Sequence, residues 1–256
     1  GTNCGLIGRN AAVEVDGVAY WMSSKGFLLY DGTVKTLPCS VEDEVFDNLD
    51  TTKGQQIAAG LNNLFSEIVW WYPTNSDFNN RGVSYNYAES TGVAGGVWAL
   101  STEARSSWMD AKIYERPYAT KFDTSGTGTF PTILGQSGLG QTKYFQHEIG
   151  TDQVNEDGSV TKVTSNLQSY DLDLQTQAGA GDLFVSVSRF IPDFKTLNGN
   201  SDVTLSVKRF PSQTETSSTN SPFTIDSSTT KKDTRARGRY VNVKIENKNE
   251  NESWRY

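Results

Sequence analysis

The stretch from residue 13 to residue 39 constrains the fold more than any other. It contains three short apolar runs, which are joined by residues typical of tight turns. An Asp-Gly pair separates the first run from the second, and Gly26 and Gly32 mark the turns around the third. Asp-Gly between β-prone runs favours a hairpin, because glycine takes a positive φ without steric cost. We therefore expect an antiparallel meander about as long as one β-propeller blade. Its strands are Val13–Val15, Val18–Met22 and Phe27–Tyr30.

The length and charge of the chain limit the classes of protein to which it can belong. Its 256 residues, of which 36% are hydrophobic, can form one large all-β domain or two smaller ones. The formal net charge of −7 argues against tight duplex-DNA binding through bulk charge, which needs a basic face. No window holds the roughly 18–20 apolar residues that a membrane span needs, so we expect none. The chain lacks an initiator Met and ends among aromatic residues, and we expect a piece of a longer polypeptide.

A short helical insertion and a second β unit follow the meander. Ser40 is a good N-cap for a helix that reaches Leu49, with carboxylates in its first turn, where the helix dipole favours them. A second helical turn is expected over residues 53–59. The β pattern resumes at residues 68–73, 83–87 and 97–100 and repeats the aromatic strand and glycine turn of the first unit. We expect residues 1–156 to form β-propeller-type meander blades with a helical insertion around residues 40–60.

The remaining residues, 157–256, alternate apolar and polar side chains more regularly. A period of two is typical of half-buried strands, and the connections between the runs are polar or rich in glycine. The expected strands are residues 160–165, 169–174, 183–190, 203–210 and 238–246. They predict an additional antiparallel β region, which the sequence leaves open as a sandwich or as further blades. The predicted fold class is therefore all-β with one or two short helices.

Few residue patterns in the chain indicate chemistry. His147 is the only histidine, no G-x-S-x-G elbow surrounds a serine, and the longer glycine fingerprints of phosphate-binding loops are absent. We therefore expect no catalytic residues, no cofactor and no metal site, and a protein that is not an enzyme. Cys4 and Cys39 could pair, but free, mostly buried thiols are the favoured interpretation.

Carboxylates are numerous in the chain, so counting them does not exclude a glycosidase that uses a pair of acidic residues. The candidates are Asp16, Asp31, Glu42 and Asp43. Asp16 and Asp31 also begin tight Asp-Gly turns, and Glu42 and Asp43 fit the start of a helix. The structural interpretation of all four is favoured.

A basic segment, residues 229–239, stands out in this acidic chain. If it is extended, Arg235, Arg237 and Arg239 lie on one side of the strand at a period of two. Such a guanidinium row could pair with carboxylates of a neighbouring subunit or track phosphates. The alternative is a solvated strand face.

A cluster of aromatic residues is a second candidate. Trp70, Trp71 and Tyr72, together with Tyr85 and Tyr87, could form a platform on which sugars stack. Aromatic residues at strand period are more often the core of a blade, and this is the favoured interpretation.

Four segments together resemble the tail nozzle proteins of short-tailed bacteriophages, which are also described as tail tubular or DNA-stabilisation proteins. The first reads GLIGRNAAVEVDGVAYWMSSKGFLLYDGTVKTLPCSVED (5–43), and the second contains EIVWWYP and VSYNY within residues 67–87. The third is SRFIPDF (188–194), and the fourth is PFTIDSSTTKKDTRARGRYVNVKIEN (222–247). These segments are spread over most of the chain, and none is a catalytic signature.

The resemblance implies a structural virion protein that contains a β-propeller and forms a homohexameric ring in the phage tail, below the portal and adaptor. Its partners would be its own copies, the tail adaptor and other tail proteins, with assembly in the cytoplasm of the bacterial host. Genome DNA would pass through the channel without sequence-specific binding, since an acidic lining lets phosphates slide. The arginine row would then lie at subunit contacts more than in the lumen. The rival functions are a receptor- or glycan-binding propeller of a phage tail and, less favoured, a propeller glycosidase.

Overall fold

The computed structural model describes residues 4–110, 113–123, 141–155, 157–172, 184–210, 213 and 222–255. In these residues the chain is all-β with two short helices, α1 (Glu42–Asn48) and the 3-10 helix η1 (Thr51–Gln56), which confirms the expected fold class. It divides into two compact units, Gly1–Glu148 and Ile149–Tyr256. The sequence placed the change of character after residue 156.

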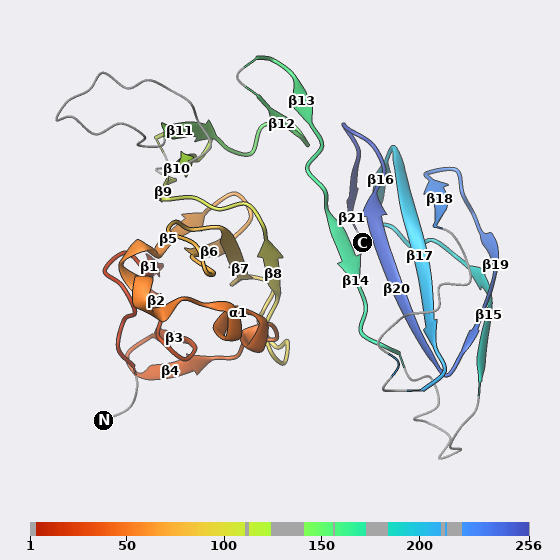
Figure 1. Cartoon of the computed structure of the whole chain (residues 1–256), viewed down its shortest axis with the longest axis horizontal. Helices are drawn as coiled ribbons and strands as arrows, with labels where there is room; N and C mark the ends of the chain where they lie inside the picture. Colours follow the sequence, from red (N-terminus) through yellow and green to blue (C-terminus); the bar gives the residue numbers. More distant parts are fainter. Residues whose placement is uncertain are drawn as a thin grey trace. The chain divides into compact units, whose positions relative to one another are not determined.

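The first unit begins with the expected meander, a four-stranded antiparallel sheet in the order β1-β2-β3-β4 (Figure 1). Asp16 and Gly17 have positive φ values of 49° and 83°, and they form the two-residue turn between β1 and β2. A fourth strand lies beyond the three expected runs and pairs with β3. The strands are β1 (Ala12–Val15), β2 (Val18–Met22), β3 (Phe27–Tyr30) and β4 (Val34–Leu37).

A second meander follows in the order β5-β6-β7-β8. Three of its strands lie at the runs 68–73, 83–87 and 97–100 that the sequence predicted, but the first strand was missed. Ala58 and Ala59, which the sequence assigned to a helical turn, begin β5 because η1 ends at Gln56 and the backbone pairs with β6 from Ala58 to Asn62. The strands are β5 (Ala58–Asn62), β6 (Glu67–Tyr72), β7 (Arg81–Asn86) and β8 (Trp98–Ser101).

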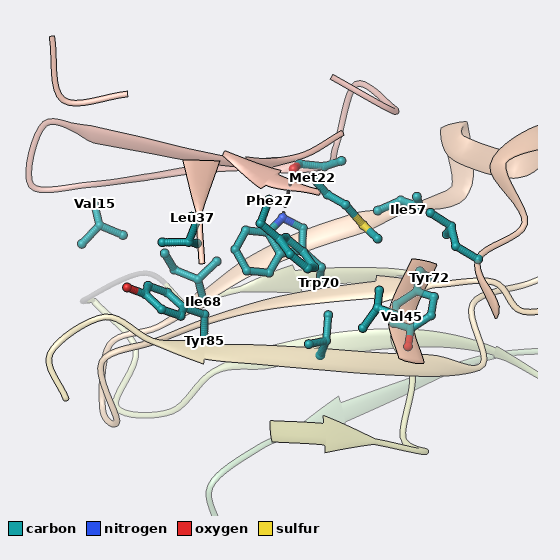
Figure 2. Close-up of a cluster of buried hydrophobic side chains, with 13 residues drawn as sticks. Val15, Met22, Phe27, Leu37, Val45, Ile57, Ile68, Trp70, Tyr72 and Tyr85 are labelled. Carbon is teal, nitrogen blue, oxygen red and sulfur yellow. Dashed lines mark hydrogen bonds between the residues drawn. The ribbon is translucent and has the colours of Figure 1, made fainter. Parts of the chain in front are cut away.

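One apolar core fills the space between these two sheets (Figure 2). Strand alternation directs Met22 and Phe27 from the first sheet, and Ile68 and Trp70 from the second, into the same cluster. The ring centroids of Phe27 and Trp70 lie 4.9 Å apart. Burial of aromatic side chains of this size is the main favourable contribution to a core.

Helix α1 connects the two sheets and closes one side of the same core. Val45 is fully buried, and the Phe46 ring lies 5.2 Å from that of Phe27. The expected cap is corrected: Val41 occupies the N-cap position, and no side chain caps the helix, so Ser40 does not have this role. The expected carboxylates are present in the first turn, where their negative charge interacts favourably with the positive end of the helix dipole.

A third sheet packs on the other face of the second meander. It has the order β11-β10-β9 and consists of β9 (Ser107–Met109), β10 (Tyr118–Asp123) and β11 (Gln141–Gln146). The Trp108 indole lies over Gly60 and donates a hydrogen bond of 2.8 Å to the Leu61 carbonyl oxygen. Strands β5 and β6 are therefore covered on both faces. Three meanders thus succeed one another, and the described residues show no closed ring of blades.

The second unit is a two-layered β structure. Its main sheet has the order β14-β20-β17-β18, and its apolar face packs against the strand pairs β15-β19 and β16-β21. The core between the layers contains Leu205 and Val207 from the main sheet and Ala236 from β19. Of the two alternatives left open by the sequence, these layers correspond to the sandwich. The strands are β14 (Asn166–Gln168), β15 (Val185–Phe190), β16 (Thr196–Asn198), β17 (Asn200–Lys208), β18 (Phe223–Asp226), β19 (Lys232–Gly238), β20 (Tyr240–Asn247) and β21 (Ser253–Arg255), and a separate hairpin pairs β12 (Gln153–Val154) with β13 (Val160–Thr161).

Two of the expected strands in this unit differ from the structure. Residues 160–165 contain only the short strand β13. The strand that pairs with β20 on the side away from β17 is β14, which begins at Asn166. In the segment 169–174, Leu172 forms an isolated bridge to Val241, and residues 173 and 174 lie outside the described residues.

Candidate functional site

The arginine segment forms strand β19, whose side chains alternate between the core and the solvent. Thr234 and Ala236 are buried, whereas Arg235 and Arg237 are exposed on the opposite face. The strand pairs antiparallel with β15, and Arg237 lies opposite Ser186 in the register. Because both arginines project from one face at a period of two, this part of the prediction is confirmed.

The third arginine does not continue the row. β19 ends at Gly238, and the chain turns at Arg239 before β20 begins at Tyr240. The Arg239 backbone N–H donates a hydrogen bond of 2.8 Å to the Lys208 carbonyl oxygen, and its half-buried guanidinium lies 5.5 Å from the Tyr240 ring centroid. The expected row of three is therefore a pair, because the strand ends one residue too early.

Two lysines precede this pair in the chain, Lys231 just before β19 and Lys232 at its first residue. Lys231 and Lys232 are exposed, and we call them, with Arg235 and Arg237, the basic strip. Asp233 is the carboxylate within the segment, and it accepts a hydrogen bond of 3.1 Å from Arg189 on β15. The Arg237 guanidinium lies 5.7 Å from the Phe184 ring centroid. No ion pair within the described part of the chain engages Arg235 or Arg237, so the strip presents net positive charge to a partner.

The negative charge of the chain is concentrated in the first unit. Residues 1–148 contain 16 Asp and Glu against 10 Lys and Arg, whereas residues 149–256 contain 14 against 13. Helix α1 alone has four carboxylates and no basic residue in its last turn. The two units therefore differ in charge, and the basic strip belongs to the nearly neutral one.

The aromatic residues of the proposed sugar platform are core residues. Trp70, Trp71 and Tyr72 are 0%, 4% and 2% exposed. Trp70 points into the core between the first two sheets, and Trp71 points to the other side, where its ring centroid lies 5.2 Å from that of Trp108. Adjacent residues of one strand are both buried because their sheet is covered on both faces. These rings offer no open face to a sugar.

The four acidic candidates serve the turns and the helix. Asp16 occupies the left-handed position of the first tight turn. Asp31 accepts a hydrogen bond of 2.5 Å from the Lys35 ammonium, which lowers the pKa of this carboxyl. Glu42 and Asp43 lie in the first turn of α1. The arrangement matches the structural interpretation that the sequence favoured.

A buried arginine and the only histidine form a cluster that no sequence pattern indicated. The Arg105 Nε donates a hydrogen bond of 2.9 Å to the Nε2 of His147, and its guanidinium lies 4.4 Å from the Phe145 ring centroid. Glu103 pairs with the same guanidinium at 3.2 Å. Burial, together with the charge of Arg105, lowers the pKa of His147 to about 4. The imidazole is therefore a neutral acceptor that holds the third sheet in place.

Two half-buried glutamates lie close to this region. Burial and the charge of Glu148 raise the pKa of Glu67, and burial raises the pKa of Glu148. The Glu148 carboxylate accepts a hydrogen bond of 2.9 Å from the Asn62 amide, and Asp110 accepts two from Asn63. The carboxylates of Glu148 and Asp110 thus fix the turn between β5 and β6. Within the described residues, no group of three or more His, Cys, Asp or Glu side chains could hold a metal ion.

The outer face of the third sheet carries exposed tyrosines. The rings of Tyr118 and Tyr144 are stacked, with centroids 5.5 Å apart and an angle of 21° between their planes. Tyr114 contacts Tyr118 edge to face at the same distance, and the Tyr144 side chain is 66% exposed. We call these three residues the tyrosine face. The sequence did not single them out, because they lie in segments without a clear period.

Cys4 and Cys39 do not form a disulfide, as the favoured interpretation predicted, and both residues are half-buried. Burial raises the pKa of the Cys39 thiol to about 11, so it stays protonated at neutral pH. Neither of the two helices in the described ranges has the length and apolar character needed to cross a membrane. Scans against protein-family models and against curated proteins find no match to this chain.

Proposed function

We propose that the chain is a structural subunit of a virion tail, a nozzle-type protein that forms a homo-oligomeric ring around the channel for genome ejection. The observation that carries this proposal is the basic strip, an exposed cationic strand in a chain of net charge −7. The second unit has the positively charged basic strip, and the first unit has an excess of negative charge. Opposite charges on the two units favour a head-to-tail contact between copies. Head-to-tail contacts of this kind form rings when the rotation between copies closes.

The architecture of the first unit supports a structural role in an assembly. Three meanders succeed one another in the first unit, and strands β5 and β6 of the middle one are covered on both faces. Repetition of blade-like sheets is the principle of the β-propeller, which is the fold that the resemblance to tail nozzle proteins implies. A channel lined by an acidic subunit repels DNA phosphates, so the genome slides through without sequence-specific binding. Localisation in the tail, contact with the adaptor and assembly in the host cytoplasm belong to the same proposal.

The mass and symmetry of the particle test this proposal. Native mass spectrometry of the purified chain, followed by electron microscopy, is expected to show a ring, with six copies as the number that the resemblance implies. A strict monomer without affinity for any other tail component would contradict the proposal.

A second candidate function is glycan or receptor binding, and the tyrosine face favours it. The Tyr144 side chain, which is 66% exposed and stacks on the half-buried Tyr118, presents an aromatic ring and a hydroxyl group, which suit the apolar side of a sugar ring. A glycan array distinguishes the two functions. Binding that is lost in the variant Tyr118→Ala/Tyr144→Ala would favour the receptor function, and an array without signal would count against it.

A further inference from the structure

The basic strip fits a specific partner surface, which is the exposed side of helix α1 in a second copy of this chain. We propose that Arg235 and Arg237 of one copy pair with Asp43 and Asp47 of the next. This inference rests on the proposed ring and names its subunit contact.

The spacing of the charges supports the pairing. Residues two apart on a strand are separated by about 6.6–6.8 Å, which is the distance between the bases of the two arginine side chains. Residues four apart on a helix rise by about 6 Å along its axis and lie on one face, so Asp43 and Asp47 present carboxylates at a matching interval. Each planar guanidinium can then take one carboxylate in a forked pair.

The burial of the two elements supports it as well. α1 turns Val45 into the core of the first unit and leaves Asp43, Glu44 and Asp47 exposed. β19 turns Thr234 and Ala236 inward and leaves its arginines exposed. Within the described residues no ion pair engages the α1 carboxylates or these two arginines. In the described part of the chain, both surfaces thus have no ion pair of their own, and they have opposite charge.

Charge reversal of each side separately, and then together, tests the contact. The variant Arg235→Glu/Arg237→Glu places like charges in the contact and is expected to weaken assembly by roughly a hundredfold, since like-charge juxtaposition is costly. The variant Asp43→Lys/Asp47→Lys is expected to do the same from the other side. The control Arg9→Glu/Lys25→Glu changes the net charge by the same amount as the variant Arg235→Glu/Arg237→Glu, at exposed positions of the first unit, and is expected to assemble as the unmodified chain does.

An equimolar mixture of the two reversed variants separates a contact between copies from one within a chain. In a ring that alternates the two variants, every contact joins opposite charges, so the mixture is expected to assemble as the unmodified chain does, although each variant alone assembles weakly. One chain with all four substitutions is expected to assemble by itself. Native mass spectrometry gives the stoichiometry, and circular dichroism checks that each variant is folded.

Several outcomes would overturn the inference. Normal assembly of either reversed variant would mean that the strip or the helix lies outside the contact. Rescue in the fourfold variant without rescue in the mixture would place the pairing within one chain. A fourfold variant that stays monomeric would remove the pairing altogether. In these three cases the proposed ring still stands, whereas an unmodified chain that is monomeric would overturn the ring as well.

Discussion

The only histidine of the chain accepts a hydrogen bond from a buried guanidinium, and the titration of its imidazole measures this role. His147 Nε2 receives the hydrogen bond from Arg105, so protonation of the ring would break it and place two cations together. Burial first, and the Arg105 charge second, lower the pKa of His147 to about 4. Because no other histidine is present, NMR of the imidazole signals is expected to give one titration near pH 4.

The same chain unfolded in urea provides the control, and its imidazole is expected to titrate near the ordinary value of 6.5. Between these two values the unfolded chain binds a proton that the folded chain does not. The free energy of unfolding of the first unit is therefore expected to decrease as the pH falls from 6.5 to about 4. A folded-state titration at or above pH 6.5 would contradict the buried acceptor role.

Glu252 ties two strand connections of the second unit together through one carboxylate, the one between β16 and β17 and the one between β20 and β21. It accepts hydrogen bonds from the backbone N–H groups of Asn200, Lys248 and Asn249 and from the side-chain amides of Asn200 and Asn249. Burial alone would raise the pKa of Glu252, but these donors lower it to about 2. Glu252→Gln places an amide against these donors and is expected to reduce the free energy of unfolding by about 2–3 kcal/mol.

Glu250→Gln, an exposed neighbour, is the matched control and is expected to leave the stability unchanged. The folded pKa of Glu252 is lower than the unfolded value of 4.5, so its contribution is complete above pH 4.5 and is lost as the pH falls towards 2. Urea unfolding at several pH values measures both effects. Equal stability of the two variants would show that the carboxylate is not needed.

At the scale of the elements, the contact between the second and third sheets depends on a glycine. A Cβ on Gly60 would lie 2.5 Å from a carbon of the Trp108 indole. Gly60→Ala is therefore expected to displace the indole and to destabilise the first unit by about 1–3 kcal/mol. Thermal unfolding measures this loss, and the near-UV circular dichroism of the tryptophans is expected to change with it.

Gly5→Ala is the control, because a Cβ there has nothing within 4 Å. If Gly60→Ala leaves both the unfolding temperature and the tryptophan signal unchanged, the third sheet does not pack on β5 as described.

The elements that the sequence predicted are those whose pattern is local. β2 and β3 were predicted because apolar runs and glycine turns are read from adjacent residues. β5 was missed because its alanines and glycine have low β propensity. Gly60 leaves room for the indole of Trp108, which is distant in the sequence, so the reason for a glycine in this strand is not visible locally.

The candidate site divides in the same way. A period of two placed Arg235 and Arg237 on one face, but β19 ends at Gly238, and this removed Arg239 from the row. A Cβ on Gly238 would lie 2.8 Å from the Cβ of Val207, a close approach to a neighbouring strand that the pattern of one strand does not show. The pairing of Arg105 with His147 joins residues 42 positions apart and leaves no signal in the sequence.

At the scale of the whole molecule, the proposed assembly combines charges that each contribute little. An exposed ion pair stabilises by roughly 0.2–1 kcal/mol, so the contact between the basic strip and helix α1 sets the orientation of the copies more than the affinity. A ring repeats the contact at every interface, and closure makes all of them act together. The net charge of −7 opposes this by repulsion between copies, which is strongest at low salt.

Ionic strength therefore tests which charge effect dominates. The Debye length is about 30 Å at 0.01 M salt and about 3 Å at 1 M, so salt screens exposed pairs strongly. If the pairing of opposite charges orients the ring, the assembled fraction measured by light scattering is expected to decrease from about 0.1 M to 1 M salt. The chain with all four charges exchanged is expected to follow the same curve, because its contact has the same pairs in reverse. Assembly that increases steadily with salt in both chains would mean that apolar surfaces hold the copies together and that the charges only oppose them.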